Sequence, residues 1–257
     1  MRDGTNGLEA AVEALSHRFP ELHFGWAEAD FRPLAYVGEE EIARWIDATE
    51  RLAPELDTKT AAAYFLSIMT WQLGQVLATL YLSRLPLPRF GAEAIGIGVM
   101  LAGTEGRHSL DFDFRFHMAE EGTPLDRGAM AESIVALVTP VLKALHGHTR
   151  LAPRAMWSLL ADGISAGFLS FGKQTEETAF AMAEAEAILR RPQLPLFNPR
   201  WRFATVEAHG RTEPFRLRGG CCRLYRSPVF PFCTTCVLRS EDDQIERLKA
   251  LIVDSKD

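Results

Sequence analysis

Four cysteines are the residues of this chain whose type and spacing most clearly predict chemistry. They are Cys221, Cys222, Cys233 and Cys236, and the rest of the 257-residue sequence has none. Cysteine thiolates are ligands for zinc and for iron–sulfur clusters, and a C-x-x-C turn brings two sulfurs towards one metal centre. Their crowding near one end of a large chain is typical of a metal site in a reducing compartment. Disulfides of secreted proteins more often link distant loops.

The residues alone leave three kinds of site open. A structural zinc site usually takes a C-x-x-C pair from each side, and the adjacent cysteine pair fits that geometry poorly. A dithiol or disulfide site at the C-x-x-C leaves the adjacent pair unexplained. A 2Fe–2S cluster needs two sulfurs on each of two irons and accepts less regular spacing, which favours the cluster over zinc. We expect Gly219 and Gly220 to supply the backbone freedom that an adjacent pair requires.

The same residues resemble the C-terminal motif of the FhuF-type ferric-siderophore reductase family. The matching pattern is Gly219-Gly-Cys-Cys-Arg-Leu-Tyr-Arg226, ten residues between Cys222 and Cys233, and then Cys233-Thr-Thr-Cys236. Weaker landmarks are a helix with Trp71, the Gly-rich strand after it, and Arg154-Ala-Met-Trp157, so the resemblance covers about residues 55 to 240. It implies that the four cysteines bind a 2Fe–2S cluster and are catalytic through it.

The resemblance also implies a function. The expected protein is a cytoplasmic reductase that transfers one electron from the cluster to Fe(III) held by a siderophore and so releases Fe(II) after import. Hard oxygen ligands bind Fe(III) far more strongly than Fe(II), so reduction loosens the iron. The expected partners are a hydroxamate-type ferric siderophore and a protein electron donor such as a ferredoxin, with peripheral association at the inner membrane. Two other functions stay open: a zinc-stabilised siderophore- or ligand-binding protein without redox chemistry, and an iron–sulfur electron carrier.

The charge distribution separates the cysteine region from the rest of the chain. The net charge is −6, which argues against a nucleic-acid binder. In residues 200–226, however, seven arginines against Glu207 and Glu213 give a local charge of +5. Positive charge beside a cluster stabilises its reduced state, and it attracts anionic chelates and acidic donors. The candidate docking residues are Arg216, Arg218, Arg223, Arg226 and Arg154.

A second set of polar residues lies upstream. Arg154, Trp157 and Asp162 stand at i, i+3 and i+8 of one predicted helix, where they either hold substrate or, for Trp157, anchor the core. No nucleotide-binding fingerprint accompanies them, because Gly96-x-Gly98 is too short and no Walker A sequence is present. Electrons are therefore expected from a separate protein.

The elements that must position these residues predict an α+β fold. We expect a helix-rich body with a β-hairpin over residues 1–195 and a small four-cysteine module over residues 196–257. Apolar periodicity predicts helices at 7–19, 39–52, 58–82, 124–145 with a break or kink near Pro140, 153–171, 175–190 and 241–252. His146-Gly-His148 is expected to be a turn. Strands are predicted at 94–102 and 109–117, joined by a turn at 104–106, and a second hairpin is predicted over 201–217.

One apolar stretch bears on localisation. No charged residue lies between Lys59 and Arg84, a length that could span a bilayer. Gln72 and Gln75 interrupt it and are unfavourable in lipid, so a buried helix of a soluble core is predicted. The polar segment Met1–Gly7 lacks the apolar core of a signal peptide, which again predicts a cytoplasmic protein.

Overall fold

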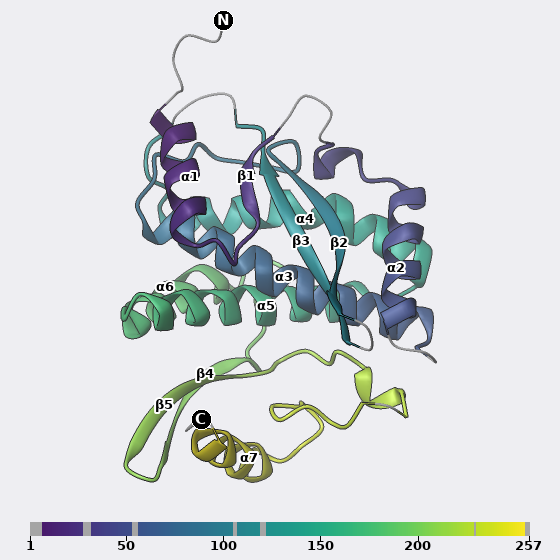
Figure 1. Ribbon diagram of the computed structural model, residues 1–257, viewed down its shortest axis with the longest axis vertical. Coiled ribbons are helices and arrows are strands. Elements are labelled where there is room, and N and C mark those ends of the chain that lie inside the picture. Colours follow the sequence, from purple (N-terminus) through teal and green to yellow (C-terminus); the bar gives the residue numbers. More distant parts are fainter. Residues whose placement is uncertain are drawn as a thin grey trace, which may run out of the picture.

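The structure is a computed structural model that describes residues 7–27, 32–52, 56–104, 107–118, 122–228 and 230–254. It confirms an α+β protein in which helices predominate. Figure 1 shows a helical body with a small sheet and, at one end of the molecule, a hairpin, a long loop and a last helix. The helices of the body are α1 (Gly7–Arg18), α2 (Glu39–Leu52), α3 (Thr58–Leu82), α4 (Arg127–Thr149), α5 (Pro153–Gln174) and α6 (Thr178–Leu189), with a 3-10 turn η1 (Leu34–Tyr36).

Helices α3 and α5 form the centre of the body, and small residues let their backbones approach each other closely. A Cβ atom added to Gly167 of α5 would overlap the backbone of Gly74 in α3. One added to Gly163 would overlap the side chain of Thr70, whose hydroxyl donates to Leu66 O at 2.7 Å. Larger side chains at these positions would force the helices apart, so the small residues are required for this contact.

The uncharged stretch predicted to be a buried helix is α3. By length and composition alone, both α3 and α4 are long and apolar enough to cross a membrane. Most of α3 is nevertheless buried within the protein, against α5, α2 and the sheet. Gln72 bonds the sheet through both ends of its amide: Nε2 donates to Leu110 O, and Oε1 accepts from Phe112 N. Its polar group therefore serves the internal packing of the body.

A three-stranded sheet covers one side of α3. Its order is β1 (Phe24–Trp26), β3 (Arg107–Phe116) and β2 (Ile95–Thr104). The predicted hairpin of β2 and β3 is confirmed, although the turn expected at 104–106 includes residues outside the described ranges. Strand β1, which pairs with β3 in parallel, was not predicted, because its three residues lie in a segment punctuated by Pro and Gly. From Leu110 onward the alternation in β3 buries one face, formed by Leu110, Phe112, Phe114 and Phe116.

Two predictions about the helices of the body were wrong, and a third is narrowed. α4 continues past Pro140 to Thr149 as one helix, so of the break or kink expected at Pro140 the break is excluded. His146-Gly-His148 lies within the last turns of α4, and His146 Nδ1 lies 2.8 Å from Leu151 O, the residue after the C-cap. Thr175 ends α5 rather than opening α6, because its backbone N–H bonds Phe171 O.

The C-terminal module has its own small core. The hairpin β4 (Arg202–Ala208) and β5 (Arg211–Leu217) turns through His209 and Gly210, which both have positive φ, as a two-residue hairpin loop requires. The last helix, α7 (Glu241–Asp254), packs on this hairpin. The buried side chains that they share are Val206, Leu217, Leu248 and Ile252. Leu196 and Trp201, by contrast, pack into the large core of the body.

Candidate functional site

The four cysteines lie in the long loop between β5 and α7 and line one cavity. The cavity has a volume of about 220 Å³ and is otherwise lined mainly by apolar residues: Gly220, Leu224, Tyr225, Phe230, Pro231 and Val237. All four thiols are free of disulfides. Cys222 and Cys236 are buried, and Cys221 and Cys233 are half-buried. The structure therefore brings together both halves of the predicted motif.

Local backbone geometry shapes both halves. The C-x-x-C is a tight turn closed by a hydrogen bond from Cys236 N to Cys233 O at 3.1 Å. After the adjacent pair, Arg223 takes a left-handed conformation with φ of 63°, and its N–H points to Cys221 Sγ at 3.4 Å. The 3-10 turn η2 (Leu224–Arg226) follows directly. The left-handed residue thus comes directly after the cysteine pair. Gly219 and Gly220, which were expected to supply the freedom for a bend between the two cysteines, do not take a positive φ.

The two glycines are required for a different reason, which is close approach. A Cβ on Gly219 would lie 2.5 Å from Asn198 Nδ2, and one on Gly220 would lie 3.0 Å from Leu159 N in α5. Neither glycine has a positive φ. Their lack of a side chain lets the cysteine loop sit directly against α5.

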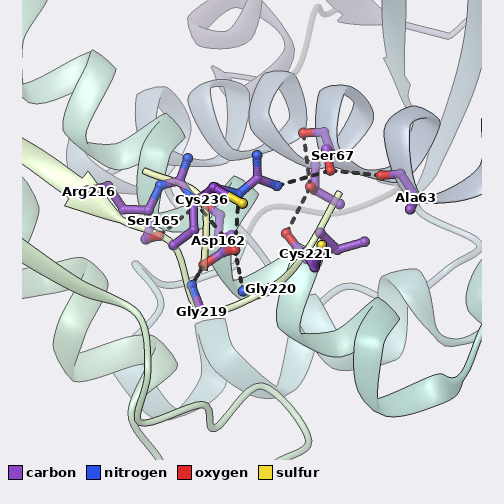
Figure 2. Close-up of polar contacts among 12 residues, drawn as sticks. Ala63, Ser67, Asp162, Ser165, Arg216, Gly219, Gly220, Cys221 and Cys236 are labelled. Atoms are coloured by element: carbon purple, nitrogen blue, oxygen red, sulfur yellow. Dashed lines mark hydrogen bonds and ion pairs between the residues drawn. The ribbon is translucent and has the colours of Figure 1, made fainter. Parts of the chain in front are cut away.

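Asp162 of α5 anchors the loop at this point. Its Oδ1 accepts from Gly219 N and its Oδ2 from Gly220 N, both at 2.8 Å (Figure 2). Burial raises the pKa of Asp162, while two neighbouring arginines and the two N–H donors act in the opposite direction. Because both oxygens accept hydrogen bonds, which is the role of an ionised carboxylate, we treat Asp162 as charged.

Two arginines surround this carboxylate. Nη1 of Arg216 lies 3.6 Å from Asp162 Oδ2, and Nε of Arg218 lies 3.7 Å from the same oxygen. Arg218 also donates to Ser67 Oγ on α3 at 3.4 Å. Both guanidiniums are largely buried, and three of their nitrogens have no hydrogen-bond partner among the described residues: Arg216 Nε, Arg216 Nη1 and Arg218 Nε. One carboxylate therefore faces two buried cations, and a positive charge is left over beside the thiols.

The thiols respond to this charge and to one another. The pKa of Cys222 lies below its ordinary value because Cys233 donates a hydrogen bond to it and Arg218 stabilises its thiolate. The pKa of Cys233 is raised because it is the donor of that pair. Burial raises the pKa of Cys221. The environment favours a thiolate at Cys222, the state in which cysteine binds metals.

Two further polar side chains hold the backbone of the C-x-x-C turn. Arg239 Nε donates to Cys233 O at 3.0 Å and its Nη2 to Phe232 O at 3.1 Å. Gln244 of α7 donates to Cys236 O at 3.1 Å. No sequence pattern predicts these contacts, because each joins a side chain to a backbone carbonyl in an irregular loop.

The arrangement of the thiols determines which kind of metal group the residues could hold. Among the described residues, no set of three or more His, Cys, Asp or Glu side chains is close enough to hold a single metal ion. The four thiols surround a cavity instead of converging on a point, and the nearby guanidiniums are suited to an anionic group. The residues are compatible with a thiolate-bound group larger than one ion, whereas a zinc ion would require the sulfurs to close in.

The five predicted docking arginines fall into three environments. Arg216 and Arg218 are buried around Asp162. Arg223 and Arg226 both pair with Asp57, the N-cap of α3, at 3.4 and 3.3 Å. Arg154 is exposed, has no ion-pair partner among the described residues, and lines a separate cavity. The structure does not gather the five arginines into one docking surface.

The set of Arg154, Trp157 and Asp162 is likewise divided. Arg154 and Trp157 line the separate cavity, whereas Asp162 turns to the cysteine loop. Sequence reasoning therefore identified Asp162 as a polar residue of interest and missed its role as an anchor. A carboxylate among apolar positions of a core helix was the signal available.

Comparison with known proteins adds no assignment. No protein-family profile matches this chain, and no curated protein sequence matches it either. The function is therefore inferred from the cysteine spacing and from the geometry around it.

Proposed function

We propose that this chain is a ferric-siderophore reductase whose four cysteines hold a 2Fe–2S cluster. One observation carries the proposal: Cys221, Cys222, Cys233 and Cys236 line a single apolar cavity beside buried arginines. When bound, such a cluster supplies one electron at a time, which reduces Fe(III) to Fe(II) and is replaced from a separate donor protein such as a ferredoxin.

The residues of the chain support this chemistry in two ways. Asp162 and the turn after the cysteine pair preorganise the loop, so that the thiols share one cavity. The uncompensated positive charge of Arg216 and Arg218 favours the more negative, reduced state of a bound group, which raises its potential. The apolar lining limits access of water to the thiols.

Single-turnover electron transfer tests the proposal. The protein, purified without oxygen and reduced with dithionite, is freed of excess reductant and mixed with ferric siderophores of several classes. We expect about one Fe(II) per chain, trapped by ferrozine, as the visible spectrum returns to that of the oxidised protein. Cys222→Ser should abolish this reaction, and Thr234→Ser, a conservative change within the C-x-x-C turn, should preserve it.

Each alternative function has its own outcome. A coloured protein that passes electrons to no ferric siderophore would favour the electron carrier. A colourless protein with stoichiometric zinc would favour the zinc-stabilised binding protein. Either result would contradict the reductase.

A further inference from the structure

Cys222 lines two cavities. One is the four-cysteine cavity, and the other is a cleft of about 280 Å³ between α3, α5 and the end of β5. Cys222 and Leu224 belong to both linings, whereas Cys221, Cys233 and Cys236 belong to the lining of the four-cysteine cavity and not to that of the cleft. A group held by the four thiols is therefore approached from the cleft at Cys222.

An exposed aromatic side chain contributes to the cleft. Trp71 is 41% exposed, although most of the residues around it in α3 are buried. Its Nε1 donates to Ser170 Oγ of α5 at 3.4 Å, which holds the indole across the two helices. An exposed indole is a large apolar surface that a ligand can cover. The volume of the cleft is just below the usual range of small-molecule sites, so it accommodates one face of a chelate and leaves the rest in solvent.

The polar part of the cleft is suited to hard oxygen ligands of iron. Arg216 and Arg218 line it, and the acidic side chain among its described residues is Asp162. Both oxygens of Asp162 already accept from Gly219 N and Gly220 N. Guanidinium N–H groups donate to the oxygens that hold Fe(III), and such hydrogen bonds draw electron density from the iron and favour Fe(II). Because four thiolates with their cluster are themselves anionic, they offset the two arginines, and the cleft fits an uncharged chelate.

We propose that this cleft is the docking site of the ferric chelate, with Cys222 as the thiol between the chelate and the bound group. The inference rests on the proposed function, because it places the acceptor of that reductase. One face of an uncharged trihydroxamate covers Trp71 and turns its oxygens towards Arg216 and Arg218. Fe(III) gains one electron and becomes Fe(II), and the reduced group at the thiols loses that electron. No bond to the protein forms, and no proton is required.

Filling the cleft tests the inference through binding alone. The probe is gallium ferrichrome, an uncharged trihydroxamate complex whose Ga(III) is not reduced, titrated into the full chain by isothermal calorimetry. Two half-buried residues of α5 provide matched changes: Ala166 lines the cleft, and Ser158 lines the separate cavity with Arg154. Ala166→Trp should weaken binding by at least about tenfold, because the new indole occupies the cleft. Ser158→Trp should bind as the wild type does.

Truncation of the exposed indole is the second test. Trp71→Ala should weaken binding of gallium ferrichrome by about fivefold, the loss expected for one aromatic contact. Phe180→Ala is the control, because Phe180 of α6 is 40% exposed and does not line the cleft. Because Trp71 is exposed, this variant decides the question if Ala166→Trp does not fold. Far-UV circular dichroism verifies the folding of each variant.

The outcomes separate the docking site from the reductase. Absence of binding to the wild type, wild-type affinity in Ala166→Trp and Trp71→Ala, or loss of binding in Ser158→Trp would overturn the inference. If Ala166→Trp abolishes binding and the wild type forms no Fe(II) from ferric ferrichrome, the docking site stands and the reductase falls. If the wild type and Ala166→Trp form Fe(II) equally, the reductase stands and the docking site falls.

Discussion

The helical body and the C-terminal module are held together by different forces. In the body, α3 and α5 pack through glycines and buried apolar side chains, and the phenylalanine face of β3 closes the core. Among the side chains that the structure describes, the core of the module has four that are buried and apolar. Its cysteine loop is positioned by polar contacts from Asp162, Arg239 and Gln244.

The contrast indicates where a bound metal group would matter. A large apolar core stabilises the body on its own, whereas a small core rarely supplies enough free energy without a metal or another cross-link. Metal binding by the four thiols would then be linked to the stability of the module and not to that of the body. Substitutions in each region test this difference.

Asp162→Asn should weaken the module most. It removes the carboxylate that, within the described part of the chain, pairs with Arg216 and Arg218, and it places an amide N–H against one of two backbone donors. Breaking a buried ion pair in this way costs about 3–5 kcal/mol. Hydrogen exchange should show that Asp162→Asn, relative to the wild type, accelerates amide exchange more in residues 217–240 than in α3. Asp47→Asn, at an exposed position of α2, is the control, and equal exchange in both variants would contradict an anchoring role.

Gly167→Ala should damage the body instead. The added Cβ would overlap the backbone of Gly74, which cannot move without separating α3 from α5. We expect the free energy of unfolding to fall by about 3 kcal/mol. Gly147→Ala is the matched change, because a Cβ at that exposed position of α4 meets nothing within 4 Å. Chemical denaturation should show that Gly147→Ala is more stable than the wild type by about 0.5–1 kcal/mol. Equal stability of the two variants would refute the packing argument.

Substitutions of Asp57 test the exposed connection between the helical body and the C-terminal module. Asp57→Ala removes the N-cap of α3, whose carboxylate accepts from Thr60 N at 2.7 Å, and should cost about 1 kcal/mol. Asp57→Asn keeps the cap and loses the pairing with Arg223 and Arg226, which are partly exposed. Thermal unfolding of Asp57→Asn should therefore stay close to wild type. A loss as large as that of Asp57→Ala would show that the ion pairs, and not the cap, stabilise this connection.

A pH dependence is expected within the body. The hydrogen bonds from Arg127 and Tyr81 hold the pKa of Glu184 below its ordinary value of 4.5, although burial opposes them. Because this pKa is lowered in the folded state, the contribution is present above about pH 4.5 and is lost as the pH falls through the folded value. Glu184→Gln should remove about 1 kcal/mol at neutral pH and flatten the acid limb of the denaturation curve. An acid limb that is unchanged in Glu184→Gln would contradict this assignment. Glu132→Gln is the control: Glu132 forms an exposed pair with Arg89, so this variant should leave the acid limb unchanged.

The same contrast explains how much the sequence could predict. Helical and strand periodicity report which faces are buried, so α2, α3, α7 and both hairpins were predicted closely. Strand β1 was missed because a three-residue strand depends on its partner β3 for its conformation. The cysteine spacing predicted that the four thiols meet. It could not predict that Asp162, 57 residues before Gly219, holds the loop, since long-range polar contacts leave no periodic pattern.

The most direct test of the account is the composition and magnetism of the metal group. Iron, acid-labile sulfide and zinc are measured in protein purified without oxygen, and the dithionite-reduced sample is examined by electron paramagnetic resonance. We predict about two iron and two sulfide per chain and a signal from one unpaired electron, which is lost in Cys222→Ser and kept in Thr234→Ser. Stoichiometric zinc without sulfide, or an unchanged signal in Cys222→Ser, would contradict it.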